Sequence, residues 1–372
     1  MNVVAEERLP RASDSRPPGF LPPEWAPQEA VMLTWPRRDG DFAPIYADVE
    51  RCFIAIAQQI ARFEPVYINV AADGAGLRSQ LLHAGIAPPR LRVREAPNDD
   101  VWARDHGPLT VHRAGGLVHL DFRFNGWGGK FPCARDDALT AALARQGAWA
   151  APVERVDLVL EGGAIDVDGE GSLLTTERCL LAPTRNPRLD RAAIEDRLKA
   201  LLGITRVLWL THGALLGDDT DGHVDTLARF CSPRTIAFQS CDDRHDPHDA
   251  PLRAMAEELG ALRDAQGRPY ELVPLPLPRP VHDADGRRLP AGYANFLIIN
   301  GAVLMPTYAD PADARARDLL QAHFPDREVV GVDCRPLIHQ YGSLHCVTMQ
   351  IPRQIPAQGP EAVVDAADAA RP

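Results

Sequence analysis

The feature that most constrains this chain's fold is a recurring unit of two short strands, a helix and a further strand. In one copy, two β-rich runs flank Ala114-Gly115-Gly116 in PLTVHRAGGLVHLDFRF, which is a hairpin signal, and the helical stretch ARDDALTAALARQG follows. Further copies begin at GGAIDVDGEGSLLTTERCLL, HVDTLARFCSPRTIAFQS and YANFLIINGAVLMPTY, with helices expected at 189–203, 251–265 and 312–324.

Two single strands stand near the ends of the chain. EAVMLTWP precedes an expected helix at 46–63 and the strand PVYINVA, and SLHCVTMQI comes last. If the two end strands pair, they complete a fifth unit that is closed by both ends of the chain. Five such units predict an α/β fold, a five-bladed propeller-like ring with a central site, although any α/β protein alternates strands and helices.

The ends of the chain differ in composition from the middle. Residues 1–20 are polar and Pro-rich, and residues 353–372 are rich in small residues without a core pattern. No Gly/Ser or Pro linker divides the segment between them. We therefore expect flexible tails at 1–20 and 353–372 around a single domain at 21–352.

Charge and cysteine content exclude several classes of protein. The net charge of -11 argues against nucleic acid as a partner and mildly favours a cationic substrate. Seven cysteines without a C-x-x-C pair argue against a disulfide framework or a structural zinc site. No apolar signal-peptide region and no apolar run of about 18 residues is found, so we expect a cytoplasmic protein without a membrane span.

Polar residues stand at the same place in each unit, just before its first strand pair. In a ring, equivalent positions converge on the axis. The residues are Asp105 in NDDVWARDHGP, Glu161 in LVLEGG, His223 and Asp225 in DDTDGHVD, Asn295 in YANF and Cys346 in LHC.

This set of side chains suits chemistry on a guanidinium. Two carboxylates can hold the planar cation by paired, charge-assisted hydrogen bonds. A cysteine thiolate can attack its central carbon, and a histidine can protonate the departing nitrogen and then activate water. Each residue by itself has an ordinary alternative: Cys346 and His223 as core residues, Glu161 as a turn residue, and Asp105 beside Arg104 as a surface ion pair.

With these motifs, residues 20–352 resemble the agmatine deiminase and bacterial-type peptidylarginine deiminase family of the guanidine-modifying pentein superfamily. The further motifs PPEWAPQEAVMLTWP, FRFNGWGGK and GSLHCVTMQIP support the resemblance. It implies the five-bladed α/β-propeller (pentein) fold and deimination of agmatine to N-carbamoylputrescine in polyamine synthesis. It also implies no cofactor, no metal and a homodimer.

The same resemblance assigns roles residue by residue. Cys346 matches the nucleophile, His223 the general acid/base, and Glu161 the acid beside that histidine. Asp105 and Asp225 match the carboxylates that bind the guanidinium, and Trp102 matches a wall of the pocket. The distal amine of agmatine would meet one of the carboxylates in the run Asp218, Asp219 and Asp221.

One stretch departs from the family pattern. Many agmatine deiminases carry a run of glycines before the His-Cys pair, whereas here the stretch reads QYGSLHC and only Gly342 remains. Tyr341 and Leu344 make the loop stiffer and bulkier, because glycine runs permit unusual backbone angles and close ligand approach. We expect this departure to affect the substrate's tail more than the chemistry.

Other functions stay open at this point. The first alternative is the same chemistry on free arginine, peptidyl-arginine or a methylated arginine, for which Arg104 or Arg123 would have to meet a carboxylate. A metal-binding protein is the second, because residues 242–249 (DDRHDPHD) are rich in donors, although a solvated loop explains that run more simply. A non-catalytic binding protein and a Cys-His protease are the remaining alternatives.

Overall fold

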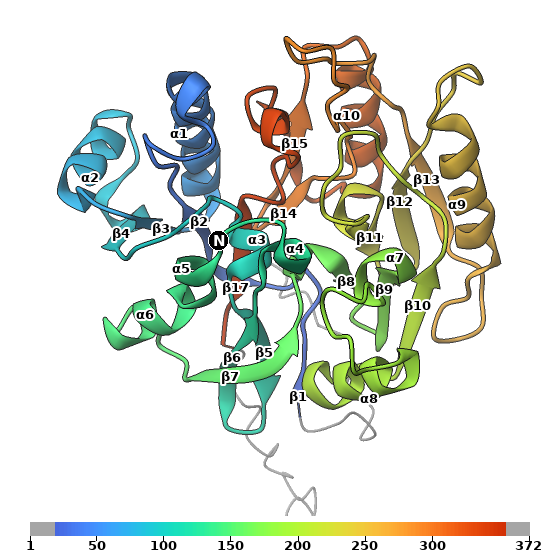
Figure 1. Cartoon of the computed structure of the whole chain (residues 1–372), viewed down its shortest axis with the longest axis horizontal. Coiled ribbons are helices and arrows are strands. Elements are labelled where there is room, and N and C mark those ends of the chain that lie inside the picture. The colour runs from blue at the N-terminus through green and yellow to red at the C-terminus, as the bar shows by residue number, and fades with distance from the viewer. Residues whose placement is uncertain (1–18, 355–372) are drawn as a thin grey trace, which may run out of the picture.

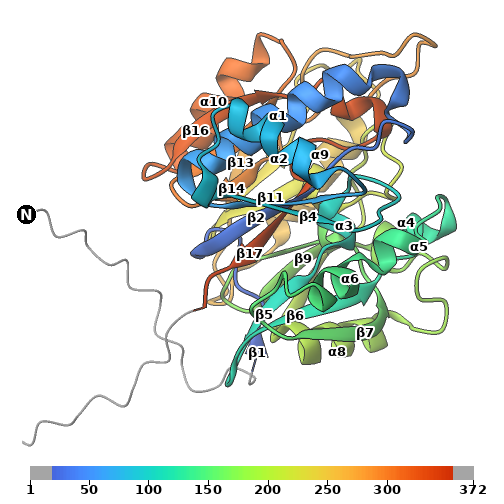
Figure 2. The same ribbon diagram turned by 90° about the vertical axis from the view of Figure 1, so that its left-hand side faces the viewer.

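The computed structural model describes residues 19–354 and arranges their strands in five separate sheets. In each sheet a first strand pairs antiparallel with a second, and the second pairs parallel with a third. A parallel partner requires a crossover connection, and in each unit the crossover contains the helices. Figures 1 and 2 show the long helices on the outside of the molecule and the short helix α3 near its middle.

The sheet that joins the ends of the chain has the order β17-β2-β3-β4. Its strands are β2 (Gln28–Thr34), β3 (Val66–Val70), β4 (Leu91–Glu95) and β17 (Thr348–Pro352), and its helices are η1 (Ala43–Ile45), α1 (Tyr46–Phe63), α2 (Gly74–His83) and η2 (Pro88–Arg90). The two end strands pair as predicted, with Met349 opposite Met32, and Figure 2 shows them side by side. The helix predicted at 46–63 is α1, whereas α2 and β4 had no counterpart in the prediction.

The second sheet has the order β1-β5-β6-β7. Its elements are β1 (Gly19–Phe20), α3 (Ala103–His106), β5 (Leu109–Arg113), β6 (Gly116–Arg123), α4 (Gly126–Gly129), α5 (Ala134–Asp137), α6 (Leu139–Arg145) and β7 (Val153–Val159). The predicted hairpin turn lies between β5 and β6. Of the predicted tails, Gly19 and Phe20 form β1, and Arg353 and Gln354 hydrogen-bond Pro27 and Leu117. The rest of both tails lies outside the described residues.

The remaining three units follow the predicted order of elements. The first comprises η3 (Gly162–Ala164), β8 (Ile165–Val167), β9 (Ser172–Thr176), α7 (Glu177–Leu180), α8 (Arg191–Leu202) and β10 (Arg206–Leu210). The second comprises η4 (Val224–Thr226), β11 (Ala228–Ser232), β12 (Thr235–Gln239), α9 (Asp249–Ala261) and β13 (Glu271–Leu275). The third comprises β14 (Leu297–Ile299), β15 (Ala302–Thr307), α10 (Ala312–His323), β16 (Glu328–Asp333) and η5 (Leu337–Gln340). Helix α8 shows the expected end signals: Asp190 caps its first turn and Gly203 ends it at φ 65°.

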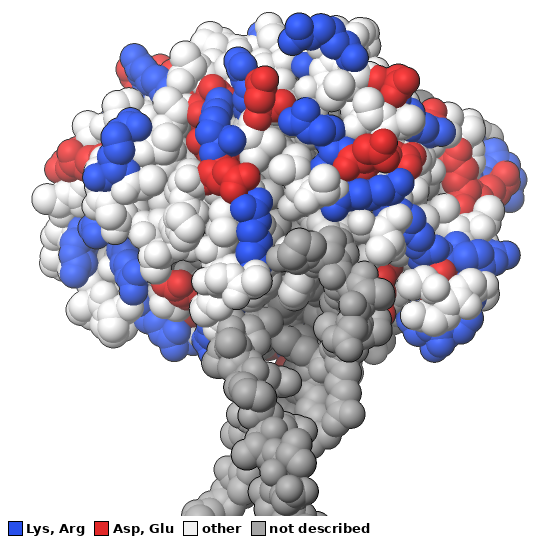
Figure 3. All heavy atoms as spheres, turned by 90° about the horizontal axis from the view of Figure 1, so that it is seen from below, with Lys and Arg blue, Asp and Glu red and all other residues white. Residues whose placement is uncertain are grey.

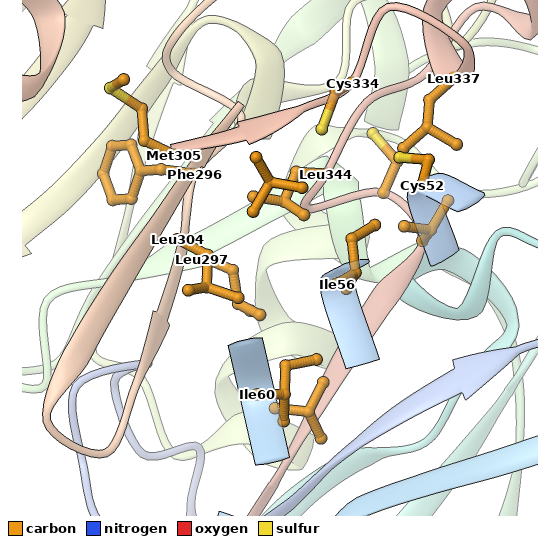
Figure 4. Packing of buried hydrophobic residues seen from close by; sticks show 14 of the residues in the cluster. Cys52, Ile56, Ile60, Phe296, Leu297, Leu304, Met305, Cys334, Leu337 and Leu344 are labelled. Carbon is orange, nitrogen blue, oxygen red and sulfur yellow. The ribbon is translucent and has the colours of Figure 1, made fainter. Parts of the chain in front are cut away.

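The largest core cluster includes the buried face of α1 and the β14–β15 pair. Apolar residues of α1 recur at helical spacing, at Val49, Cys52, Phe53, Ile56 and Ile60, and form one buried face. Figure 4 shows Leu344 among the side chains of this core, beside those of α1 and the β14–β15 pair. The segment that leads to Cys346 is therefore anchored by hydrophobic burial.

The charged surface is mixed. On the face shown in Figure 3, basic and acidic side chains alternate, so that face has no continuous basic stripe of the kind that binds nucleic acid. Within residues 19–354, no helix has the length and apolar character needed to cross a membrane.

Candidate active site

The predicted site residues come from short helical turns that precede the strand pairs. Asp105 lies in α3 before β5, Glu161 directly precedes η3 before β8, and Asp225 lies in η4 before β11. His223 precedes η4, and Cys346 lies in the segment between η5 and β17. These turns place side chains from distant parts of the sequence next to one another.

Gly163 marks the point where three of these side chains meet. A Cβ atom at Gly163 would lie 2.7 Å from His223 Nδ1, 2.9 Å from Asp105 Oδ1 and 3.1 Å from Asp225 Oδ2. The Gly163 amide donates a hydrogen bond to Asp105 Oδ1 at 3.1 Å. The glycine is required here because a side chain would occupy the space that the three polar groups share.

Cys346 lies on the other side of Asp225. Its Sγ is 3.7 Å from Asp225 Oδ2 and 3.4 Å from Asn295 Oδ1. Burial, and after it the charges of Asp225 and Asp105, raise the pKa of the Cys346 thiol well above its ordinary value. A cation bound between the thiol and the carboxylates would offset these charges and favour the thiolate.

His223 is fully buried between two sets of acidic groups. Burial by itself would lower the pKa of this imidazole, but the charge of Asp105, 3.6 Å from Nδ1, and the neighbouring Cys179 and Glu161 raise it above the ordinary histidine value. The ring is thus held as an imidazolium, the form that can donate a proton. Glu161 is itself fixed by Arg185, whose Nε donates to both of its oxygens at 2.9 and 3.0 Å.

A pocket of about 410 Å³, counted with its open mouth, leads from the surface to Cys346 and Asp105. Its lining residues are Asp41, Asp100, Trp102, Asp105, Trp127, Phe131, Asp219, Thr220, Gln340, Tyr341, Gly342 and Cys346. His223, Glu161 and Asp225 are not among its lining residues. Asp225 Oδ2 is 3.7 Å from Cys346 Sγ, and His223 Nδ1 is 3.6 Å from Asp105 Oδ1, so both side chains directly adjoin the inner end of the pocket. Trp102 lies in the wall, as the resemblance implies, with Nε1 donating to Asp100 Oδ2 at 2.9 Å.

Among residues 19–354, four carboxylates and no arginine or lysine line this pocket. Arg104 is buried and bonded to Gln350, and Arg123 pairs with Asp157 at the surface, so neither is placed to meet a ligand carboxylate there. Of the three carboxylates expected near a distal amine, only Asp219 lines the pocket.

The altered stretch before Cys346 affects the pocket through one residue. Tyr341 lines the pocket and has a left-handed backbone at φ 74°. Leu344 is fully buried in the core and does not line the pocket. The expected influence of this stretch on the substrate's tail therefore concerns Tyr341.

Among the residues described, one group has the donor atoms for a metal ion. Glu161, Cys179 and His223 bring one donor each within 4.8 Å of one another. Arg185 already bonds both oxygens of Glu161, so the group fits a charged set around His223, paired with Arg185, better than a resident metal site. Within 242–249, Asp242 pairs with Arg315, and Asp246 pairs with His248 and Arg288. Residues 242–245 are exposed, as the solvated-loop interpretation expects, whereas Asp246 and His248 are largely buried and their polar groups are paired within the protein.

Sequence reasoning missed several residues of the site. Trp127 donates from Nε1 to Asp105 Oδ2 at 2.9 Å, and Cys179 contacts the His223 ring. His345 bonds Asp225 Oδ2 at 2.7 Å. Trp127 and Cys179 lie within the sequence motifs FRFNGWGGK and TTERCLL, and His345 directly precedes Cys346. Their position within or beside these motifs was the one sequence feature that could have indicated a place in the site.

Comparisons with known proteins agree on one family. The family model described as Porphyromonas-type peptidyl-arginine deiminase matches residues 20–352. Agmatine deiminase of Stutzerimonas stutzeri (strain A1501) is 37% identical over 360 residues, covering 90% of this chain and 95% of that protein.

Solved structures show the same similarity. A C. jejuni agmatine deiminase variant with substrate bound has a TM-score of 0.83 at 34% identity, over 90% of this chain and 96% of that one. A Porphyromonas gingivalis structure, described provisionally as an arginine deiminase, has a TM-score of 0.83 at 50% identity, over 90% and 98%. An amidinotransferase from Microseira wollei, at 11% identity over 90% and 97% and a TM-score of 0.50, shows the shared fold alone.

Proposed function

This chain belongs to the Porphyromonas-type peptidyl-arginine deiminase family, and from that premise we propose that it hydrolyses agmatine to N-carbamoylputrescine and ammonia. The observation that carries the proposal is the pocket: it reaches Cys346 and Asp105, and in the described part of the chain it is lined by four carboxylates and no arginine or lysine. A guanidinium at the inner end and an ammonium toward the mouth would match this distribution of charge. Free arginine would add a carboxylate that no lining residue could neutralise.

In the proposed first step, Asp105 and Asp225 bind the planar guanidinium by hydrogen bonds and fix its orientation. The positive charge of the guanidinium offsets the negative charges of the two carboxylates. The Cys346 thiolate then attacks the central carbon, and an S–C bond forms. His223 donates a proton to a terminal nitrogen, the C–N bond breaks and ammonia leaves. A positively charged S-alkylthiouronium remains on Cys346, and Asp105 and Asp225 stabilise its charge.

In the second step, His223 acts as a base. The neutral imidazole takes a proton from water, and the resulting hydroxide oxygen adds to the thiouronium carbon. As the C–S bond breaks, the hydroxyl proton of the adduct passes to solvent, where the released ammonia takes it up, so the neutral substituted urea leaves and the Cys346 thiolate is restored. Glu161, fixed by Arg185, keeps His223 oriented through both steps and stabilises its cationic form.

We extend the proposal to the setting of the enzyme. The five sheets are interpreted as the blades of a pseudo-symmetric propeller, because the helical turns before the strand pairs bring residues of separate units together. All seven cysteines are free thiols, which supports a reducing compartment such as the cytoplasm. The product leads toward putrescine and polyamine synthesis. A homodimer and the absence of a cofactor stay predictions.

The test is ammonia release by the purified protein with agmatine, free arginine and an arginine-containing peptide in parallel. We expect release from agmatine in preference to the others, and none from Cys346→Ala, because the attacking atom is gone. Cys241→Ala is the matched control and should keep the activity, since Cys241 does not line the pocket.

Each outcome has a distinct meaning. Near wild-type release by Cys346→Ala would refute the mechanism. Preferential release from arginine or the peptide would retain the mechanism and replace the substrate. If none of the three substrates releases ammonia, the assignment of this chain as an active deiminase on these guanidines is wrong.

A further inference from the structure

Behind Asp225 lies a buried set of ionisable side chains, which we call the buried charge cluster. Its members are Glu24, Arg104, Asp166, Asp225, Arg229 and His345, with exposed fractions between 0% and 8%. They come from parts of the chain that are far apart, including the segment before β2 and the residue beside Cys346. Charges removed from water to this extent require partners, because desolvation of an unpaired ion is costly.

His345 lies between two carboxylates of this cluster. Its Nδ1 is 2.7 Å from Asp225 Oδ2, and its Nε2 is 2.7 Å from Glu24 Oε2. Ionised carboxylates only accept hydrogen bonds, so both contacts are hydrogen bonds when both ring nitrogens carry a proton. The geometry therefore indicates an imidazolium.

The charges of the cluster lead to the same protonation state. Three carboxylates face two guanidinium groups, so a cationic His345 gives three charges of each sign. A neutral ring would leave a buried negative charge without compensation. Burial would raise the pKa of Glu24, but the charges of Arg229 and His345 hold it well below its ordinary value.

Glu24 is in turn held in place by groups that do not reach the pocket. Its Oε2 is 2.9 Å from Arg229 Nη2 and 3.5 Å from Arg104 Nη2, and its Oε1 accepts from the Ile298 amide at 2.7 Å. Arg229 is also bonded to Asp166 at 2.9 Å. The position of the His345 ring is thus set by a network of buried, oppositely charged groups.

Asp225 has one oxygen committed to this network and one that is not. Its Oδ2 bonds His345 and faces Cys346 Sγ, whereas its Oδ1 is buried without a hydrogen-bond partner within residues 19–354. The other groups that act on Asp225 are His223, Arg229, Arg104 and Asp105, and Asn295 bonds its carbonyl oxygen.

We propose that Glu24 and His345 form a positioning pair in which the His345 imidazolium keeps Asp225 ionised and turned toward the guanidinium. His345 contacts Asp225 directly and Glu24 contacts His345, so both act through Asp225, whose Oδ2 is 3.7 Å from Cys346 Sγ. The proposal rests on the proposed function, because it assigns Asp225 to a guanidinium. The proposal adds His345 as a second cation beside the site. Unlike His223, His345 exchanges no proton during turnover.

The first test reads the charge of the ring without any substrate. Long-range 1H–15N NMR distinguishes an imidazolium from both neutral tautomers, and the His345 signals are assigned by their loss in His345→Asn. We expect cationic His345 in the wild type at neutral pH. In Glu24→Gln the charged acceptor of Nε2 is gone, so we expect a larger share of neutral ring than in the wild type at the same pH.

The second test uses kinetics with agmatine. His345→Asn and Glu24→Gln should lower kcat/KM by about 10²-fold, since a displaced binding group has effects of that size. The acid limb of the pH profile, which Asp105 sets in the wild type, should change in both variants, because Asp225 loses a nearby positive charge, takes up a proton more readily and contributes its own protonation to the limb. Asp166→Asn is the control: it disturbs the same cluster but does not touch Asp225 or His345, so it should leave the acid limb in place.

Two results would overturn the proposal. One is a neutral His345 ring in the wild type at neutral pH. The other is an acid limb that is the same in the wild type, Glu24→Gln and His345→Asn. Because the NMR measurement needs no substrate, absence of activity on agmatine would count against the proposed function and leave this inference testable.

Discussion

At the scale of single residues, the site is defined by carboxylates that are removed from water but held by specific donors. Asp105 accepts hydrogen bonds from Trp127 and the Gly163 amide, and Asp225 accepts from His345. Burial disfavours the charged form of a carboxyl group, and these donors favour it. The balance between burial and these hydrogen bonds decides at which pH each carboxyl group is ionised and can bind a cation.

This balance leads to a prediction for the pH dependence. Burial, with the charges of Asp225 and Glu161, raises the pKa of Asp105 to about 6, although His223 opposes the shift. Asp105 must be ionised to bind a guanidinium, so kcat/KM should fall as the pH decreases through about 6. Asp219→Asn is the control, since it removes a carboxylate at the pocket wall and should lower kcat/KM without moving the limb. A profile that stays flat well below that pH would contradict this assignment.

Gly163 gives a second prediction at this scale. In Gly163→Ala the new Cβ would lie 2.7 Å from His223 Nδ1 and 2.9 Å from Asp105 Oδ1, too close for either group to stay in place. We expect loss of kcat/KM by about 10²-fold or more in ammonia-release assays. Gly115→Ala is the matched control, because no atom lies within 4 Å of its Cβ position. Comparable activity of the two variants would show that the space at Gly163 is not needed.

At the scale of elements, the segment from Gln340 to Cys346 combines two kinds of restraint. Leu344 is buried in the core beside α1, and Gly342 lies flat against the Trp102 ring. Tyr341 adopts a left-handed backbone and stacks under the Arg287 guanidinium at 4.6 Å. Packing therefore restrains the segment at Tyr341, Gly342 and Leu344. A run of glycines at these positions would leave the backbone more conformational freedom.

Gly342 provides the prediction for this element. A Cβ at this position would lie 2.2 Å from one atom of the Trp102 ring and under 3.0 Å from two others, so the segment or the ring must move. We expect Gly342→Ala to lower kcat/KM by about 10²-fold, while the far-ultraviolet circular dichroism spectrum stays unchanged. If substrate binding in Gly342→Ala is the same as in the wild type, the contact with Trp102 does not shape the pocket.

At the scale of the whole molecule, the pairing of β17 with β2 joins the two ends of the described chain. Met349 of β17 is 1% exposed and packs against Gly107 and Gly162, next to the turns that carry Asp105 and Glu161. The closing strand therefore stabilises the fold and supports the site at the same time.

The closing strand can be tested by its contribution to stability. Met349→Ala should reduce the free energy of unfolding by about 2–5 kcal/mol, as for other fully buried side chains of this size. Urea unfolding measures this change, and Leu216→Ala, at a 47% exposed position, should stay within about 0.5 kcal/mol of the wild type. Equal midpoints and slopes for the two variants would mean that β17 adds little to the stability of the fold.

The chain's local pattern was sufficient to predict most elements and their order. Alternating and helical periodicities mark α1, α8, α9, α10 and the four internal hairpins, because burial of one face acts through neighbouring residues. Repetition of the unit then indicated that the end strands pair. The strands β4 and β7 and the helix α2 were not predicted. In β4 and β7 three residues each are exposed without strict alternation, and α2 has only three buried residues, so neither periodicity is clear in the sequence.

The same pattern placed Cys346, His223, Glu161, Asp105 and Asp225 at equivalent points of the units, and the structure brings these five together. The orientation of Asp225, the cluster behind it and the lining of the pocket depend on tertiary structure alone. His345 and Glu24 are separated by 321 positions in the sequence, and their contact has no local pattern. Paired charges and a shared pocket depend on distances in space, whereas periodicity records only which face of an element is buried.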